Sequence, residues 1–292
     1  MTVETLLAAW NGFFFEPISV LPMAVFRIVF GCVLLIDGIY MALHAREYLG
    51  PRGLTEYTRY FKRTRGRALS LFLFLFLPNS MWSVRLILAV HLIAVLMVIA
   101  GFLTPWSFIV VFVTTRSIVS RQDHMTNGGD AIAKIMCFLM IFTPAGQALS
   151  VDAWMYGGDT EAAPWAQRLM QIQLCIIYFN TFYWKLKGAT WRNGTAVYYA
   201  VSNRMYRKFR FPPFFLRTPY VQILTFGVLL LELVLGPGLW LDDLRPWLMA
   251  AAILMHLSFG FFLNVHLFGF YMIASLMTFL EPEWVAALLG GT

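Results

Sequence analysis

Apolar runs long enough to cross a lipid bilayer recur along this 292-residue chain, and they constrain its fold more than any other feature. The hydrocarbon layer is roughly 30 Å thick and dry, so a spanning segment must satisfy its main-chain hydrogen bonds internally, as a helix does. We therefore predict an all-α fold, a polytopic helical bundle integral to the membrane with about eight (seven to nine) transmembrane helices. These helices are expected at residues 23–43, 82–101, 104–119, 131–143, 167–185, 221–241, 246–263 and 266–280.

Two further apolar stretches are too short to span the bilayer. Residues 1–20 read as an amphipathic helix that lies in the membrane interface and ends near Pro17. No basic region precedes the first apolar residues, so we expect no cleavable signal peptide. The run at 68–78 is expected in the interface or as a re-entrant piece. Because no internal repeat or linker is evident, residues 1–292 are predicted to form a single membrane domain.

The composition excludes an ordinary soluble domain. Hydrophobic residues make up 60% of the chain and charged residues only 13%, whereas a soluble domain carries about 25% charge. Lipid is therefore an expected partner. The three cysteines show no CxxC or Cys/His spacing, so no metal site is predicted.

The net charge of +7 is concentrated in two loops, residues 44–67 and 186–220, while 145–166 and 281–292 are acidic. By the positive-inside rule the basic loops are expected in the cytoplasm and both termini outside. Contact with anionic lipid is favoured over nucleic-acid binding, because no aromatic-interleaved nucleic-acid motif accompanies the charge.

Polar residues within the apolar runs mark candidate interior sites. A charge at mid-membrane costs roughly 2.5 to 3.5 kcal/mol, so such residues usually have a role. Arg27 and Asp37 share a helix face but lie about 15 Å apart along the axis, so each is expected to pair with another helix. Together with Lys134 they are interpreted as structural charges. Glu232 and His256 are candidates for a buried polar cluster, with a structural hydrogen bond as the alternative for either residue. The remaining members of the set are Arg85, His91, Arg116, Asp130 and His266.

Lys185 closes the apolar run QIQLCIIYFNTFYWK (171–185). Helical spacing places it on one face with three other polar side chains, which suggests the wall of a pocket. Desolvation penalises a charged lysine, so in a low-dielectric pocket Lys185 would be suited to act as a general base. The alternative is a lysine that snorkels from a helix end to the interface. The residues that share its face are Gln171, Tyr178 and Thr181.

The pattern QIQLCIIYFNTFYWKLKGATWRNGTAVYY (171–199) resembles the hallmark of the HTTM membrane domain, the module shared by vitamin K-dependent gamma-carboxylase and many bacterial stand-alone proteins. Further similar blocks follow the same order as in the family, and the resemblance covers roughly residues 20–284. They are AVFRIVFGCVLLIDG (24–38), TNGGDAIAKIMCF (126–138), SVDAW (150–154), the LLLEL run around Glu232, and MHLSFGFFLNVHLFGFYM (255–272).

The resemblance implies a carboxylase-like enzyme of the carbon–carbon lyase or ligase type in the bacterial inner (plasma) membrane. In that chemistry a reduced quinone, menaquinol or vitamin K hydroquinone, is oxygenated by O2 to its epoxide. This is coupled to removal of a proton from a glutamate side chain and addition of CO2. Lys185 matches the lysine that deprotonates the quinol, His256 is implied as site-lining, and no metal is implied. The matching residues that shape the site are Gln173, Tyr178, Leu186 and Trp191.

Two departures from the family pattern bear on the reaction. Gly129 stands where the animal enzyme has a functional histidine after an asparagine pair. The neighbouring Asn127 and Asp130 are therefore further candidates for the pocket, although Asp130 is also suited to cap a helix. The chain also shows no counterpart of the lumenal region that engages the substrate protein. Quinol chemistry is thus expected more firmly than carboxylation of a protein or peptide glutamate, and the acceptor stays open.

Two other functions remain. One is a non-catalytic membrane module that assists maturation or export of a partner protein, as the distantly similar lipase maturation factors suggest. In that case Lys185→Ala is silent and the loop 145–166 governs partner binding. A small-molecule transporter is less favoured, because no pair of internal repeats or broken helices is evident.

Overall fold

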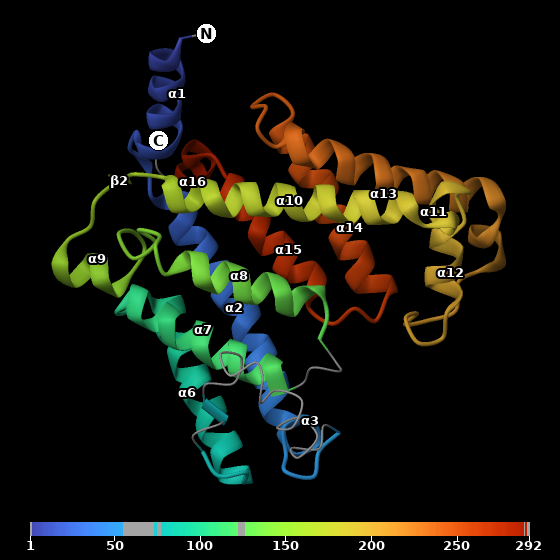
Figure 1. The fold of residues 1–292 in the computed structure, drawn as a ribbon, viewed down its shortest axis with the longest axis horizontal. Helices are drawn as coiled ribbons and strands as arrows, with labels where there is room; N and C mark the ends of the chain where they lie inside the picture. The colour runs from blue at the N-terminus through green and yellow to red at the C-terminus, as the bar shows by residue number, and fades with distance from the viewer. Residues whose placement is uncertain (1, 55–72, 75–76, 122–125, 289, 291–292) are drawn as a thin grey trace. The chain divides into compact units, whose positions relative to one another are not determined.

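The computed structural model describes residues 2–54, 73–74, 77–121, 126–288 and 290. Helices dominate the described chain (Figure 1), apart from one antiparallel pair of two-residue strands, β1 (Ile18–Ser19) and β2 (Glu161–Ala162). The fold divides into two compact units. Unit 1 comprises residues 1–168 and 280–292, and unit 2 comprises residues 169–279.

Unit 1 is built on the helices α2, α6, α7 and α8. Each of these helices packs against the next one in the chain (Figure 1). Its core is apolar, and Phe26 and Phe30 of α2 are fully buried in it. The helices of this unit are α1 (Val3–Phe15), α2 (Leu21–Leu43), α3 (Ala45–Tyr48), α6 (Met81–Ala100), α7 (Thr104–Arg121), α8 (Gly128–Met140), α9 (Val151–Tyr156) and α16 (Pro282–Leu288). Helix α10 (Trp165–Lys187) begins at the end of unit 1 and continues through the first part of unit 2.

In unit 2, α13 packs against α12 and α14, and α14 packs against α15. Gly269 allows the last of these contacts, because a Cβ there would lie 2.6 Å from the main-chain oxygen of His256 on α14. Besides α10, the elements are α11 (Ala189–Arg192), α12 (Ala196–Ser202), η2 (Pro213–Leu216), α13 (Thr218–Gly238), α14 (Arg245–Phe262), α15 (Phe268–Leu276) and η3 (Met277–Phe279).

Among the described residues, four helices are long and apolar enough to cross a membrane: α2, α6, α13 and α14. The chain is therefore a helical membrane protein, and at that level the predicted fold class is confirmed. The finer count of eight is not reached. Helices α7 and α10 have the length but carry many polar residues. Helix α8 has 13 residues and α15 has nine, too few to cross roughly 30 Å alone.

A helix is present in residues 1–20, where the sequence predicted an amphipathic helix in the membrane interface. Helix α1 ends at Phe15, two residues before Pro17, and none of its residues is buried. Its exposed apolar side chains include Leu7 and Trp10. The predicted re-entrant or interfacial run at 68–78 lies mostly outside the described residues.

The turn between α6 and α7 is fixed by two charged side chains of unit 1. The guanidinium of Arg27, which is fully buried, donates only to main-chain carbonyls near the end of α6 and before α9. Asp152 of α9 accepts hydrogen bonds from the main-chain N–H groups of Leu103 and Thr104, at 2.8 and 2.9 Å, and so caps α7. The carbonyls bound by Arg27 are those of Val98, Ile99, Ala145, Ala148 and Leu149.

Candidate functional site

Lys185 forms an ion pair with Glu232, and this pair is the centre of the candidate site in unit 2. The ammonium Nζ of Lys185 donates to Oε1 of the carboxylate, which lies on α13. The side chain of Lys185 is 23% exposed and that of Glu232 only 5%. Nζ also lies 4.8 Å from the ring centroid of Trp191 on α11, within the range of a cation–π contact. The amine is thus held by a carboxylate and an aromatic face.

The pair lies deep along α13. Glu232 is fourteen residues from the first residue of that helix and six from the last, or roughly 21 Å and 9 Å at 1.5 Å per residue. Although Lys185 is near the end of its own helix, its amine therefore sits beside the interior of a candidate membrane span. A snorkelling lysine would direct its amine toward water, and this one is directed to a buried carboxylate.

A second polar pair joins α10 to α14. The phenol of Tyr178 and Nε2 of His256 are 3.1 Å apart, and both side chains are buried. Tyr178 lies seven residues, about two turns, before Lys185, so the two pairs share one face of α10. Unit 2 thus brings together four residues that the sequence singled out: Tyr178, Lys185, Glu232 and His256.

Two buried polar atoms of this cluster have no hydrogen-bond partner among the described residues: Oε2 of Glu232 and Nδ1 of His256. A buried polar atom without a partner is costly, at about 1 to 3 kcal/mol, so each one requires an explanation such as a catalytic role or a bound water or ion. The cluster therefore has unused hydrogen-bonding capacity at a carboxylate oxygen and an imidazole nitrogen.

The other α10 candidates are arranged differently. Gln171 is buried and its Nε2 donates to the main-chain oxygen of Thr278, at 2.7 Å, so it ties α10 to η3. It also lies fourteen residues, roughly 21 Å, before Lys185, too far to line the same small pocket. Thr181 donates to the main-chain oxygen of Tyr178, at 2.9 Å, and its side chain also interacts with the carboxylate of Glu232, so it belongs beside the ion pair. Gln173 is half-buried and lies about 200° around the helix from Gln171, on another face.

The sequence pattern of the HTTM domain matches residues 15–284, nearly the whole chain. The chain belongs to the HTTM domain family. The match runs through both units and includes every residue of the cluster around Lys185. The HTTM domain is also found in vitamin K-dependent carboxylase.

A curated relative of this HTTM protein is the Uncharacterized protein YitO of Bacillus subtilis (strain 168). The two are 29% identical over 123 residues, which is 39% of this chain and 38% of YitO. The match thus spans well under half the length of either protein. No solved structure matches the chain.

Asn127 and Asp130, the residues beside Gly129, form a capping box at the start of α8 in unit 1. The side chain of Asn127 accepts from the N–H of Gly129, at 2.6 Å, and Asp130 accepts from the N–H of Asn127, at 2.7 Å. Both side chains thus satisfy main-chain donors at a helix start. The interpretation of Asp130 as a cap is confirmed, while a role for either residue in a quinone pocket stays a prediction.

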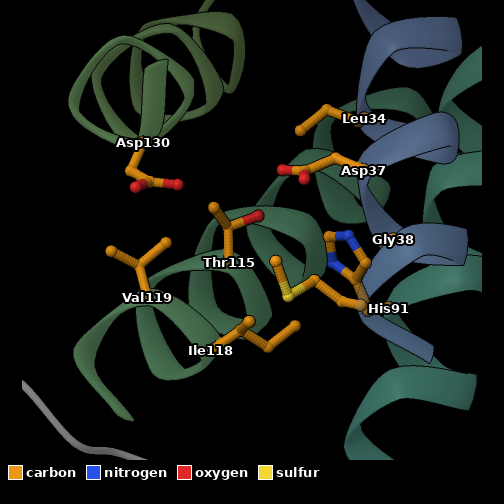
Figure 2. A pocket seen from close by; sticks show the side chains of 9 residues that line it. Leu34, Asp37, Gly38, His91, Thr115, Ile118, Val119 and Asp130 are labelled. Carbon is orange, nitrogen blue, oxygen red and sulfur yellow. The ribbon is translucent and has the colours of Figure 1, made fainter. Parts of the chain in front are cut away.

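Asp130 also faces a small cavity of this HTTM domain, shown in Figure 2. There it points toward Asp37 of α2, with His91 of α6 and Thr115 of α7 on the remaining sides. Nδ1 of His91 is 2.8 Å from the hydroxyl of Thr114, which itself donates to the main-chain oxygen of Val110. Asp37 lines this cavity with residues of α6, α7 and α8, and its pairing with another helix stays a prediction. Lys134 is half-buried on α8.

Sequence reasoning found the members of the Lys185 cluster but not their pairing. Lys185 and Glu232 are 47 residues apart, and Tyr178 and His256 are 78 apart, so no local spacing connects them. Asp152 was missed as a functional cap, although it is the acidic residue of the SVDAW block. Among the described residues, no group of three or more His, Cys, Asp or Glu side chains is arranged to hold a metal ion.

Proposed function

We propose that this HTTM protein is a membrane enzyme that binds a reduced quinone, menaquinol or vitamin K hydroquinone, and uses the Lys185–Glu232 pair as its general base. The observation that supports this most is an ion pair whose carboxylate is buried and whose second carboxylate oxygen has no partner among the described residues. Buried ion pairs contribute little to stability on average, because desolvation offsets their attraction. A pair kept at this depth is better explained by proton chemistry.

The residues of the cluster fit a quinol. A phenolic hydroxyl is a hydrogen-bond donor, and Oε2 of Glu232 is a buried acceptor without a partner. A flat aromatic headgroup also suits a site that contains Trp191 and Tyr178. When bound, a reduced quinone would supply the electrons that activate O2 and would leave as the epoxide.

Lys185 and Glu232 are proposed to handle the proton as one unit. An ion-paired lysine carries its proton and is not a base. When that proton passes to Oε1 of Glu232, the amine of Lys185 regains its lone pair and accepts a proton from the bound hydroxyl. Two ionisable groups this close titrate together, so basicity belongs to the pair. Trp191 positions the amine through its ring face, and the Tyr178–His256 pair lines the site.

The second half of the reaction is proposed to be deprotonation or carboxylation by CO2 of an acceptor whose identity is open. Gly129 offers no side chain at the position of the family histidine. Oxygenation of the quinol therefore has stronger support here than carboxylation of a protein or peptide glutamate.

The finer membrane arrangement belongs to the same proposal. We infer that α7, α8, α10 and α15 with η3 also lie within the bilayer, with α8 and α15 too short to cross it alone, so that about eight helical segments are embedded in the membrane. The polar residues of α7 and α10 would then face protein instead of lipid. The expected location is the bacterial inner (plasma) membrane, with several passes.

The proposal is tested by quinol turnover of the purified protein in lipid under O2. Wild type, Lys185→Ala and Lys187→Ala are compared. Lys187 is a matched control, because it lies two residues away and its amine contacts the rings of Tyr183 and Trp184 instead of a carboxylate. Loss of a general base costs roughly 10²- to 10⁴-fold in rate, so Lys185→Ala should lose turnover while Lys187→Ala keeps it.

Equal turnover in wild type and Lys185→Ala would contradict the proposal. So would a protein that neither binds nor consumes quinol in any form. Retention of partner binding by Lys185→Ala, with loss upon changes in 145–166, would instead support a membrane module for maturation or export.

A further inference from the structure

Residues 203–217 of unit 2, here called the basic segment, connect α12 to α13 and carry positive charge that the Lys185 cluster does not use. The segment contains five basic residues and no acid. Four of them, Arg204, Lys208, Arg210 and Arg217, are exposed, and the amine of Lys208 donates to the main-chain oxygen of Gly260.

The basic segment is ordered against the end of α14. The main-chain N–H of Lys208 donates to the oxygen of Phe262, the last residue of α14, at 3.1 Å. Arg207 pairs with Leu263 in an antiparallel bridge. The ring of Phe209 packs 5.7 Å from that of Phe262. The charges are thus presented from a fixed backbone.

These contacts place the segment at a membrane surface. Helix α13 begins at Thr218, directly after the segment, and α14 ends at Phe262, which the segment contacts. Both helices are candidate membrane spans. The start of one and the end of the other therefore meet at the same end of the α13–α14 pair, where a span meets the headgroups.

Large apolar side chains stand among the charges. Met205 is 74% exposed and Phe214 is 51% exposed. Aromatic rings alternating with cations are typical of the membrane interface, where the ring inserts at headgroup level and the cation meets phosphate. We propose that the basic segment binds the phosphate headgroups of anionic phospholipids in its own bilayer, with Arg204, Arg210 and Arg217 as the main contacts.

The test is native mass spectrometry of protein equilibrated with equal amounts of phosphatidylglycerol and phosphatidylcholine. Each cation near an anionic surface favours binding by about fivefold, so wild type should retain phosphatidylglycerol at least about fivefold over phosphatidylcholine. The variant Arg204→Gln/Arg210→Gln/Arg217→Gln should lose most of that preference. The matched Arg204→Lys/Arg210→Lys/Arg217→Lys variant should keep it, because Lys retains the charge.

A preference unchanged in the Gln variant would overturn the proposal. Tight binding of pyrophosphate by a protein that shows no preference for phosphatidylglycerol would also overturn it, since that indicates a soluble phosphate ligand. If the Gln variant does not fold, wild type alone decides the question. Raising the salt from 0.1 to 1 M shortens the screening length from about 10 to 3 Å. The preference for phosphatidylglycerol over phosphatidylcholine should therefore fall, and a preference that does not change with salt contradicts the proposal.

Discussion

Arg27 shows how a charged residue inside an apolar helix can be structural. Its guanidinium donates to five main-chain carbonyls from two segments of unit 1. Among the side chains, only that of arginine has five N–H donors. Leu149, one of the acceptors, has a positive φ of 49°, a conformation that a leucine keeps only when its surroundings hold it. Arg27 is therefore expected to contribute stability.

The first prediction concerns this residue. Arg27→Ala should lower the free energy of unfolding by about 3 kcal/mol or more, because several buried carbonyls lose their donor. Denaturant titration in lipid–detergent micelles checks it, with the exposed Arg46→Ala as control. A loss no larger than that of Arg46→Ala would remove the structural role.

The second prediction concerns the ion pair. Lys185→Met or Glu232→Gln alone should each destabilise the protein, because one charge or polar group is left buried without its partner. The double variant should be more stable than the sum of the single effects predicts, by about 1 to 3 kcal/mol. A double-mutant cycle on unfolding measures this coupling, and additive effects would mean that the two side chains do not interact.

At the residue scale, the sequence named Lys185, Glu232, Tyr178 and His256 because each is a polar group in an apolar run. The sequence left open whether the amine of Lys185 extends to the membrane interface or points into the protein, because that depends on where α10 ends relative to α13. Position along a single helix carries no information on which neighbouring helix lies opposite.

At the scale of the element, helix boundaries follow local signals that the sequence displays. Helix α8 begins behind the Asn127–Asp130 capping box, and α6 ends at Gly101, whose φ of 69° is left-handed. Most predicted spans therefore match observed helices within a few residues. The shortness of the segments at 131–143 and 266–280 is visible in the sequence, and α8 has the same 13 residues as the segment predicted for it. Helix α15 is shorter than predicted, because the chain continues as the 3-10 helix η3 after Leu276.

The third prediction tests the capping box. Asn127→Ala should lower the stability by about 1 kcal/mol, while Asn127→Asp keeps the cap; a residue that acts as a cap alone leaves quinol turnover per folded molecule unchanged. Thermal unfolding and the turnover assay measure the two effects together. Lost turnover with unchanged stability would place Asn127 in the reaction site instead.

The fourth prediction tests the packing of α15 on α14. Gly269→Ala should destabilise by about 1 to 3 kcal/mol, because its Cβ would press on the main-chain oxygen of His256. Gly260→Ala is the matched control on α14, where an added Cβ meets nothing within 4 Å. Equal unfolding midpoints for the two variants would show that Gly269 is not needed for the contact.

At the scale of the whole molecule, two units hold different kinds of polar site. Unit 1 uses buried polar groups to fix turns and helix starts, as Arg27, Asp152 and Asn127 do. Unit 2 holds the Lys185–Glu232 pair, whose carboxylate has a second buried oxygen without a partner, and in unit 1 the hydroxyl of Thr115 is likewise buried without one among the described residues. The sequence predicted a helical membrane protein from its long apolar runs and its composition. It could not divide the chain into units, because contacts between distant segments define the units and no linker marks the boundary.

The most direct test of the account follows oxygen into the product. Protein in lipid is reduced with menaquinol or vitamin K hydroquinone without air and then exposed to ¹⁸O₂, and the quinone products are analysed by mass spectrometry. The account predicts an epoxide that carries one ¹⁸O atom with wild type and none with Lys185→Ala. Absence of labelled epoxide from wild type despite demonstrable quinol binding, or equal epoxide from both proteins, would contradict it.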